Sequence, residues 1–318
     1  MQVTDIRQRC QGALEALSQV VVGKDRVLRQ VMAGILANGH ILIEDYPGLA
    51  KTLIARLFSQ ALELRFSRIQ FTPDLLPSDI TGSFLYDQRE GRFEFRQGPV
   101  FANLLLADEI NRATPKTQAA LLEAMQESQV TLEGQSFPLP QPFLVIATQN
   151  PIELEGTYPL PEAQLDRFLL RVAVGYPDAE AEREILSIRR ARRTDAVAVP
   201  VLVTRAELVA MQHALEDVFV SDALERYIVA LAQATRTDPR VALGASPRGS
   251  LAVLKLARAE AAIRGREFML PDDVKAVAVA ALAHRVILKS ELWVSRTTST
   301  QVVESLLQQV PAPPAEPA

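Results

Sequence analysis

Five short apolar runs, separated by longer stretches with helical spacing, constrain the fold of this 318-residue chain more than any other feature. Apolar runs that alternate with helices are typical of βαβ units, whose parallel strands are buried on both faces. The runs occupy residues 40–44, 66–71, 104–107, 143–148 and 168–174. The pattern predicts an α/β fold in which a parallel five-stranded sheet lies between helices in an αβα sandwich.

Two stretches interrupt this pattern with alternating apolar and polar residues. Residues 83–98 alternate around Arg89-Glu90-Gly91, and residues 130–138 alternate around Glu133-Gly134-Gln135. Alternation on both sides of a glycine-containing turn predicts a β-hairpin. We therefore expect two β-hairpins inserted into the α/β domain.

After residue 176 the helical period dominates. The helices predicted there span residues 178–193, 205–215, 222–235, 247–264 and 271–284. The last nine residues contain four prolines, which favours disorder. The expected organisation is an αβα domain over 1–176, a connecting helix and linker over 177–203, a small all-helical domain over 204–309 and a disordered tail over 310–318.

Composition excludes several classes of protein. Lys and Arg total 34 against 38 Asp and Glu, a net charge of −4, so the broad basic field of a nucleic-acid binder is missing. The single cysteine, Cys10, excludes a disulfide framework within the chain and fits a reducing compartment. No uncharged apolar run approaches the roughly 20 residues of a membrane helix. We expect a cytoplasmic protein without membrane insertion, for which nucleic acid is not a favoured partner.

The first chemical motif joins the strand at 40–44 to a helix at 53–62. Its residues are Asp45-Tyr46-Pro47-Gly48-Leu49-Ala50-Lys51-Thr52. The pattern GxxxxGK[ST] cradles phosphate at a helix N-terminus, but Asp45 and Ala50 replace its two glycines here. Lys51 can reach the β- and γ-phosphates and Thr52 can bind Mg²⁺. The alternative is a chance Lys-Thr pair, and Asp45 disfavours phosphate unless its carboxylate turns away.

Two further strand ends carry polar side chains. Asp108 and Glu109 follow the strand at 104–107, and Asn150 follows the strand at 143–148. Ligands of α/β proteins bind at the carboxyl ends of the strands. In a P-loop NTPase Asp108 would help to hold Mg²⁺, Glu109 would orient the attacking water, and Asn150 would lie beside the γ-phosphate. The alternatives are an acidic strand end and a simple Asn turn before Pro151.

Longer blocks of the sequence resemble the MoxR family of AAA+ ATPases, a helix-2-insert group, over about residues 22–283. The blocks read QFTPDLLPSDITG at 70–82, GPVFANLLLADEINR at 98–112, TQNPIE at 148–153 and EGTYPLPEAQLDRF at 155–168. The family commonly has a glycine or alanine before the lysine, so Ala50 fits it, and Asp at the position of Asp45 also occurs in it.

The resemblance implies roles for the residues at matching positions. Lys51 and Thr52 correspond to Walker A, Asp108 and Glu109 to Walker B, and Asn150 to sensor 1. Arg167 stands where relatives place an arginine finger, which acts on the ATP of a neighbouring subunit. Arg248 matches sensor 2, which contacts the γ-phosphate in its own subunit. The family's adenine pocket begins at Val22 and Gly23. Without the resemblance, Arg167 and Arg248 would be read as surface ion-pairing residues.

The resemblance also implies what the protein does. It implies a homo-oligomeric ring, expected to be a hexamer, that hydrolyses ATP with Mg²⁺ to remodel, assemble or activate a client protein, such as one with a von Willebrand factor type A domain. Three alternatives stay open. They are a nucleotide-gated scaffold with little turnover, a magnesium-chelatase-like ATPase subunit, and a nucleic-acid motor.

Overall fold

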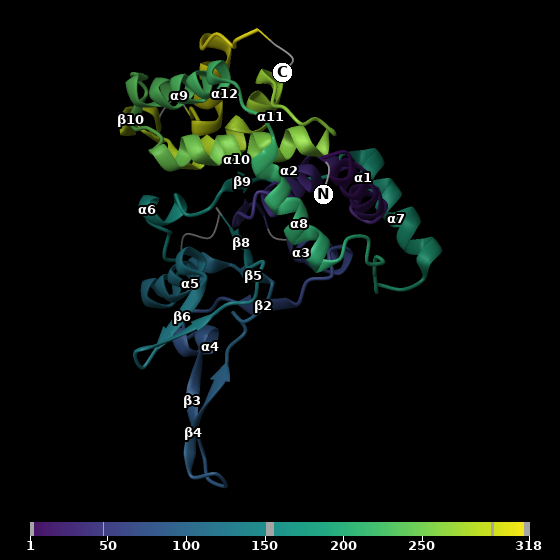
Figure 1. Ribbon diagram of the computed structural model, residues 1–318, viewed down its shortest axis with the longest axis vertical. Coiled ribbons are helices and arrows are strands. Elements are labelled where there is room, and N and C mark those ends of the chain that lie inside the picture. The colour runs from purple at the N-terminus through teal and green to yellow at the C-terminus, as the bar shows by residue number, and fades with distance from the viewer. Residues whose placement is uncertain (1–2, 47, 151–155, 294–295, 315–318) are drawn as a thin grey trace.

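The protein is built around a parallel sheet with helices on both faces (Figure 1). The computed structural model describes residues 3–46, 48–150, 156–293 and 296–314. The sheet has five strands in the order β2-β5-β8-β1-β9, and each adjacent pair is parallel. The strands are β1 (Ile41–Glu44), β2 (Phe66–Gln70), β5 (Leu104–Asp108), β8 (Leu144–Gln149) and β9 (Leu170–Val172). Each strand coincides with a predicted apolar run, so the predicted sheet is confirmed.

Alternate residues of the strands pack on opposite sides of the sheet, as the period of two of a β-strand requires. Ile41 and Ile43 belong to an apolar cluster that contains α1 (Val3–Ser18), α2 (Asp25–Leu36) and α3 (Lys51–Ala61). Leu42 belongs to a second cluster with α4 (Pro77–Thr81) and α5 (Pro115–Glu127). The sheet is therefore covered on both faces, which makes the domain an αβα sandwich.

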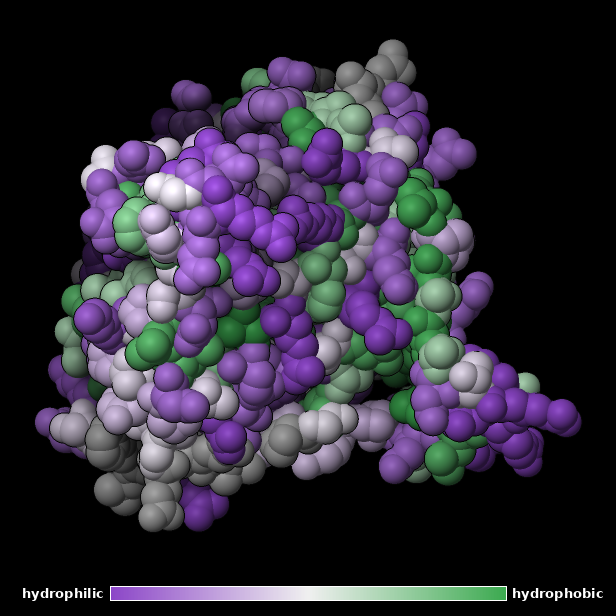
Figure 2. Space-filling view, turned by 90° about the horizontal axis from the view of Figure 1, so that it is seen from below, coloured by the Kyte–Doolittle hydropathy of each residue, from purple (hydrophilic) through white to green (hydrophobic). Residues whose placement is uncertain are grey.

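The two predicted hairpins are present. One consists of β3 (Gly82–Asp87) and β4 (Arg92–Gln97), and the other of β6 (Gln129–Leu132) and β7 (Gln135–Pro138). The first hairpin projects from the lower end of the molecule in Figure 1. Figure 2 looks at this end, where hydrophilic residues predominate and apolar residues form separate patches between them.

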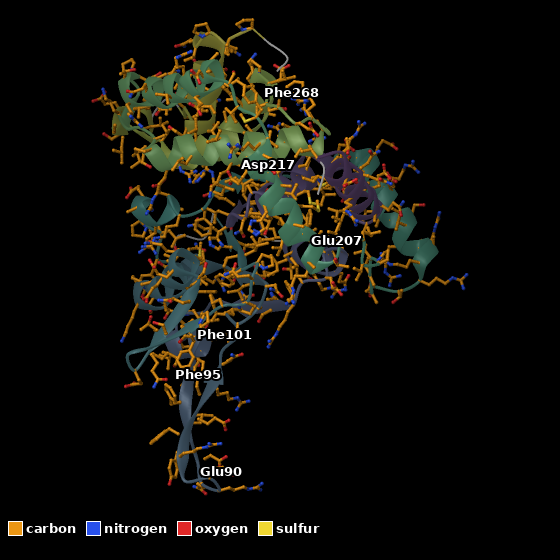
Figure 3. The ribbon with its side chains drawn as sticks, in the orientation of Figure 1. Glu90, Phe95, Phe101, Glu207, Asp217 and Phe268 are labelled. Atoms are coloured by element: carbon orange, nitrogen blue, oxygen red, sulfur yellow. The ribbon has the colours of Figure 1, made fainter. Side chains whose placement is uncertain are left out.

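Aromatic rings hold the root of the first hairpin in place. Phe95 stacks on Phe137 of the second hairpin at 4.2 Å between ring centroids, and it contacts Phe101 edge-on at 5.6 Å. In Figure 3 Phe95 and Phe101 lie near this root, whereas Glu90 lies at the tip. Gly82 closes the root with a φ of 93°, and a Cβ atom there would lie 2.2 Å from the carbonyl oxygen of Arg96. The root is thus rigid while the tip is exposed.

A connecting segment links the sheet to the C-terminal helices. The short helix α6 (Glu162–Leu165) precedes β9, and α7 (Ala179–Arg192) follows it. The predicted linker then runs along α3, where the N–H groups of Leu202 and Val203 donate to the carbonyl oxygen of Ala61. The segment is therefore held against the sheet domain.

The C-terminal part is helical apart from one short antiparallel strand pair, β10 (Val241–Leu243) and β11 (Ile287–Leu288). Its helices are α8 (Arg205–Ala214), α9 (Asp222–Thr237), α10 (Pro247–Ile263), α11 (Pro271–Leu282) and α12 (Ser299–Gln309), with 3-10 turns at Leu215–Asp217, Ala283–Arg285 and Ser290–Trp293. Buried residues of α8 to α12 continue the apolar cluster of α1, α2 and α3. The helical part therefore docks on one face of the sandwich. None of the helices within the described residues is long and apolar enough to cross a membrane.

Candidate functional site

The predicted phosphate-binding loop connects β1 to α3. Gly48 and Ala50 have φ angles of 82° and 55°, in the left-handed region, which costs an alanine about 1–2 kcal/mol. This conformation explains why the motif usually has glycine at the position of Ala50. Leu49 is buried against the core, and α3 starts directly at Lys51. The first N–H groups of α3 are thus available to an anion in the loop. Pro47 lies outside the described residues.

The negatively charged carboxylate of Asp45 does not point into this loop. Its carboxylate is buried and accepts hydrogen bonds from the N–H of Tyr46 at 2.8 Å and from the N–H of Gly175 at 2.5 Å. The ammonium of Lys51 donates to the backbone carbonyl of Asp45 at 2.5 Å. Tyr46 in turn stacks on Tyr176 at 5.8 Å. The side chain of Asp45 therefore connects the loop to the segment after β9. Its carboxylate is turned away from the loop, which is the arrangement in which Asp45 does not disfavour phosphate.

Thr52 and Asp108 lie together, as predicted. The Thr52 hydroxyl donates to Oδ2 of Asp108 at 3.3 Å, and the Thr148 hydroxyl donates to Oδ1 at 2.6 Å. A hydroxyl and a carboxylate are the hard oxygen ligands that Mg²⁺ prefers. No group of three or more metal-ligating side chains occurs among the described residues. This donor set fits Mg²⁺, which is usually bound by one or two protein ligands together with nucleotide phosphates.

Glu109 and Asn150 flank this pair at the same edge of the sheet. Glu109 has a left-handed φ of 58°, and its N–H donates to the Thr148 hydroxyl at 2.8 Å. Asn150 is 4% exposed and directly follows β8, which lies between β5 and β1. The strand order therefore brings Asn150 between the acidic pair and the phosphate-binding loop.

Three residues that the sequence does not predict contact the acidic pair. Arg68 donates from Nε and Nη2 to Oδ2 of Asp108 at 3.1 and 2.7 Å. Gln70 donates to Oε2 of Glu109 at 2.6 Å, and Nε of Arg112 lies 3.3 Å from the same oxygen. Arg68 and Gln70 are two positions apart in β2 and so lie on one face of the strand. Polar residues at that spacing, in a strand beside β5, are the signal that could have identified them.

The predicted start of the adenine pocket lies beside a cavity of about 440 Å³. Val22 is buried, and Gly23 lines the cavity with a φ of 71°. Residues of α2, β1, β9, α11 and α12 form the other walls; they include Val27, Glu44, Arg171, Val279, Ala280 and Thr300. Glu44 immediately precedes the loop, and its carboxylate pairs with Arg171 at 2.7 Å. The cavity therefore lies next to the loop, where a nucleotide base would be expected.

The two predicted arginines lie at the other edge of the sheet. Arg167 precedes β9 and donates from Nη1 to the carbonyl of Leu122 at 2.7 Å. Arg248 is the second residue of α10. Both line a cavity of about 380 Å³ with Gly39 and His40, which precede β1. The loop, by contrast, follows β1.

Arg248 lies beside Arg167 at the amino edge of the sheet, and Lys51 and Thr52 lie at the carboxyl edge. This placement does not favour the prediction that Arg248 contacts the nucleotide of its own subunit. The position of α10 in the sequence does not reveal the edge of the sheet on which the helix docks.

The fold and the arrangement at its carboxyl edge define a P-loop NTPase of the AAA+ class. The family described as "ATPase family associated with various cellular activities (AAA)" matches residues 40–170, and the AAA lid domain family matches residues 233–306. The chain is 45% identical to Chaperone MoxR1 of Mycobacterium tuberculosis over 95% of this chain and 81% of that protein. It is 44% identical to the uncharacterized protein YeaC of Bacillus subtilis over 95% and 94% of the two chains.

A crystal structure provisionally described as an ATPase from Cytophaga hutchinsonii has the same fold. It matches with a TM-score of 0.90 and 40% identity, over 98% of this chain and 97% of that one. The magnesium-chelatase 38 kDa subunit of Acidiphilium rubrum is 34% identical over only 57% of this chain and 52% of its own. The chain belongs to the MoxR family of AAA+ ATPases.

Proposed function

We propose that this protein hydrolyses ATP at a site shared between two copies in a ring. One observation carries the proposal: the groups suited to phosphate and Mg²⁺ lie at the carboxyl edge of the sheet, whereas Arg167 and Arg248 line a cavity at the amino edge. Groups at opposite edges cannot serve one nucleotide within a chain. In a closed ring with head-to-tail contacts, one edge of each copy faces the other edge of its neighbour.

The residues at the carboxyl edge have complementary parts in this reaction. Lys51 would offset charge on the β- and γ-phosphates, and Thr52 and Asp108 would hold the metal. Mg²⁺ supplies neutralisation of the charge that develops on the phosphate oxygens. Glu109, whose carboxylate is oriented by Gln70 and Arg112, would accept a hydrogen bond from the attacking water, with Asn150 beside it.

The residues at the amino edge would complete the neighbour's site. An arginine finger raises the rate by about 10³–10⁵ in GTPases because it stabilises charge in the transition state. Arg167 would supply this charge, and Arg248 would supply a second one from α10. A single copy should therefore be nearly inactive, so that assembly and turnover are coupled.

We further propose that the energy of hydrolysis remodels a client protein. The name of the relative MoxR1, a chaperone, supports this proposal. A ring of six and a client with a von Willebrand factor type A domain are what the family resemblance implies. The chelatase-like alternative has less support, because that relative matches little more than half of the chain. The alternative of a nucleotide-gated scaffold with little turnover was based on the negative charge of Asp45 in the loop. It has less support, because the Asp45 carboxylate accepts a hydrogen bond from the N–H of Gly175.

Phosphate release, measured with wild type and with Glu109→Gln over a range of protein concentrations, tests the proposal. The specific activity of the wild type should rise with concentration as rings form. Glu109→Gln should bind ATP but turn over at least about 100-fold more slowly, as expected when the group that orients and deprotonates water is lost. Equal release by the two proteins would defeat the enzymatic proposal. A specific activity independent of concentration would contradict the shared site.

A further inference from the structure

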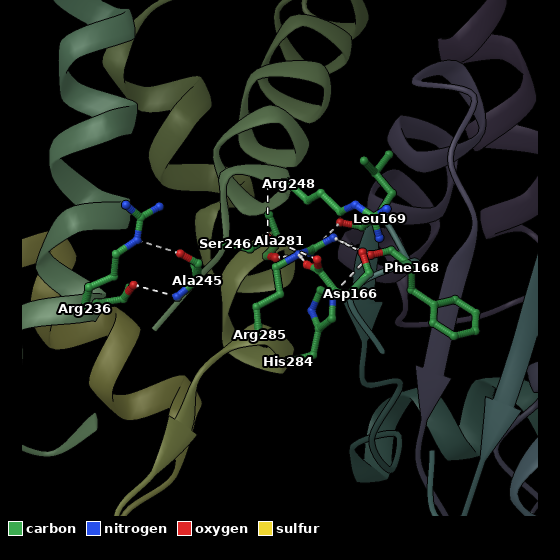
Figure 4. Close-up of polar contacts among 11 residues, drawn as sticks. Asp166, Phe168, Leu169, Arg236, Ala245, Ser246, Arg248, Ala281, His284 and Arg285 are labelled. Carbon is green, nitrogen blue, oxygen red and sulfur yellow. Dashed lines mark hydrogen bonds and ion pairs between the residues drawn. The ribbon is translucent and has the colours of Figure 1, made fainter. Parts of the chain in front are cut away.

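Asp166 connects the two parts of the molecule next to both arginines. It immediately precedes Arg167, and its carboxylate contacts the C-terminal helical part at two places (Figure 4). Oδ1 accepts a hydrogen bond from Nε of Arg285 at 2.8 Å, and Oδ2 accepts one from the Ser246 hydroxyl at 3.0 Å. One carboxylate thus bridges the sheet domain and two separate elements of the helical part.

Arg285 surrounds the same turn of chain with hydrogen bonds. Its side chain is 3% exposed and donates to the backbone carbonyls of Asp166 at 3.2 Å, Phe168 at 2.6 Å and Leu169 at 3.2 Å, as well as to that of Ala281. Burial lowers the pKa of Arg285, and the Asp166 carboxylate opposes this effect. The backbone that carries Arg167 is therefore held from one side by a buried guanidinium.

Ser246 links the same carboxylate to the start of α10. It is the N-cap residue of this helix, and its hydroxyl accepts a hydrogen bond from the N–H of Arg248 at 3.1 Å. A hydroxyl can donate one hydrogen bond while it accepts others, so Ser246 satisfies Asp166 and Arg248 together. Asp166 is thus adjacent to Arg167 in the sequence, and its carboxylate is linked to the backbone of Arg248 through the Ser246 hydroxyl.

Stability alone is a weak reason for this arrangement. A buried ion pair loses about as much in desolvation as it gains in attraction, and apolar residues of similar volume often stabilise a protein as well or better. What a bridged carboxylate provides is a defined geometry, because each hydrogen bond has a preferred direction.

We propose that Asp166 is a positioning residue that holds Arg167 and Arg248 as one unit and presents them together to the nucleotide of the neighbouring copy. The inference rests on the proposed function. It implies that the sheet domain and the helical part move together at this edge during turnover, so that a movement of α10 is transmitted to the neighbour's site.

Asp166→Asn tests the inference, because the amide keeps the size of the carboxylate and removes its charge. We expect kcat to fall about tenfold or more, as for a small misplacement of a catalytic group, with the KM for ATP within about twofold of wild type. The matched control is Asp238→Asn. Asp238 is also paired with an arginine, Arg240, at 2.9 and 2.7 Å, but both lie within the helical part. This variant should keep its kcat.

A mixing experiment separates positioning from general damage. Lys51→Ala should inactivate the nucleotide pocket of the copy that carries it, but it leaves the amino edge of that copy intact. When the two variants are mixed in equal amounts, half of the intact pockets, which belong to Asp166→Asn copies, should face the intact amino edge of a Lys51→Ala copy. The mixture should therefore reach about half of the wild-type rate per intact pocket. Arg167→Ala, mixed in the same way, is the reference.

The outcomes are distinct. If Arg167→Ala is not restored by mixing, the shared site itself is wrong. If Arg167→Ala is restored but Asp166→Asn is not, or if Asp166→Asn changes KM and leaves kcat unchanged, the positioning role is wrong. If Asp166→Asn lacks a native circular dichroism spectrum, Ser246→Ala is tested in its place, because it removes the link between Asp166 and Arg248. A lower kcat at unchanged KM would support the inference, and an unchanged kcat would overturn it.

Discussion

At the scale of single residues, the groups of the candidate site are bound to other groups of the protein. Asp108 is paired with Arg68, Glu109 with Gln70 and Arg112, and Lys51 with the carbonyl of Asp45. The Arg68 guanidinium lies 2.7 Å from the Asp108 oxygen that also accepts from Thr52, so it contacts the carboxylate expected to bind Mg²⁺. Arg68 and the metal should therefore compete for Asp108.

Arg68→Gln is expected to lower the Mg²⁺ concentration needed for half-maximal nucleotide binding. The expected shift is about fivefold, because a partly exposed ion pair is worth up to about 1 kcal/mol. Titration of Mg²⁺ at fixed ATP, followed by a fluorescent nucleotide analogue, measures it. Arg68→Lys, which keeps the charge, should behave like wild type. A higher Mg²⁺ requirement in Arg68→Gln would mean that Arg68 binds the nucleotide instead.

The same scale shows what the sequence can reveal about a site. Lys51, Thr52 and Asp108 could be proposed from the sequence because their motifs follow strands, and parallel strands bring their carboxyl ends to one edge. Arg68 was missed, because its spacing with Gln70 becomes a signal only once β2 is known to pair with β5. The edge of the sheet at which Arg248 lies was not predictable, since the docking of a helix depends on packing that is distant in sequence.

At the scale of elements, His40 joins three of them. It precedes β1, its Nε2 is 2.9 Å from the carbonyl of Met125 in α5, and its Nδ1 accepts from the N–H of Val145 in β8 at 3.0 Å. Because Nδ1 must stay unprotonated to accept, this geometry requires a neutral imidazole. Burial lowers the pKa of His40 to about 4, and the hydrogen bond to Met125 opposes that shift.

The fold should therefore lose stability as the pH falls from about 6.5 to 4. In this window the unfolded chain binds a proton at His40 that the folded chain does not, so acid favours unfolding. The full effect is about 3 kcal/mol, at roughly 1.4 kcal/mol for each unit of pKa. Urea denaturation across this range measures it. His40→Gln, which can still donate and accept, should give a flatter pH profile; an unchanged profile would contradict the assignment.

The first hairpin presents an exposed aromatic pair beyond its rigid root. Tyr86 and Phe93 face each other across the strands at 5.3 Å and are 56% and 69% exposed. Substituting both with serine should leave the melting temperature and the basal ATPase rate within error, because neither side chain belongs to the core. If the hairpin contacts the client, a Glu109→Gln protein carrying both changes should no longer retain client proteins in a pull-down with ATP. Retention at the level of Glu109→Gln alone would exclude this role.

Helices and strands were predictable where one local sequence pattern determines the type of element. The strands are apolar runs and the hairpins alternate, so both were recognised. The helix α12 was missing from the prediction. In α12 the signals are present but weak, namely buried Val302, Val303 and Leu306 and a capping box between Thr298 and Gln301. A helix that buries so few residues owes its stability to the surface on which it packs.

At the scale of the whole molecule, the helical part shares one apolar cluster with the helices beside the sheet, and a charged network joins it to the sheet at the amino edge. Each copy of the chain therefore has two different surfaces. One carries the phosphate loop and the acidic pair, and the other carries Arg167 and Arg248. A ring is the assembly in which every such pair of surfaces is used.

The most direct test of this account is phosphate release by an equal mixture of Lys51→Ala and Arg167→Ala, each of which should be nearly inactive alone. The account predicts that the mixture regains turnover, because Arg167→Ala pockets then face intact arginines on Lys51→Ala neighbours. A mixture no more active than its two components, under conditions where the rings exchange subunits, would contradict it.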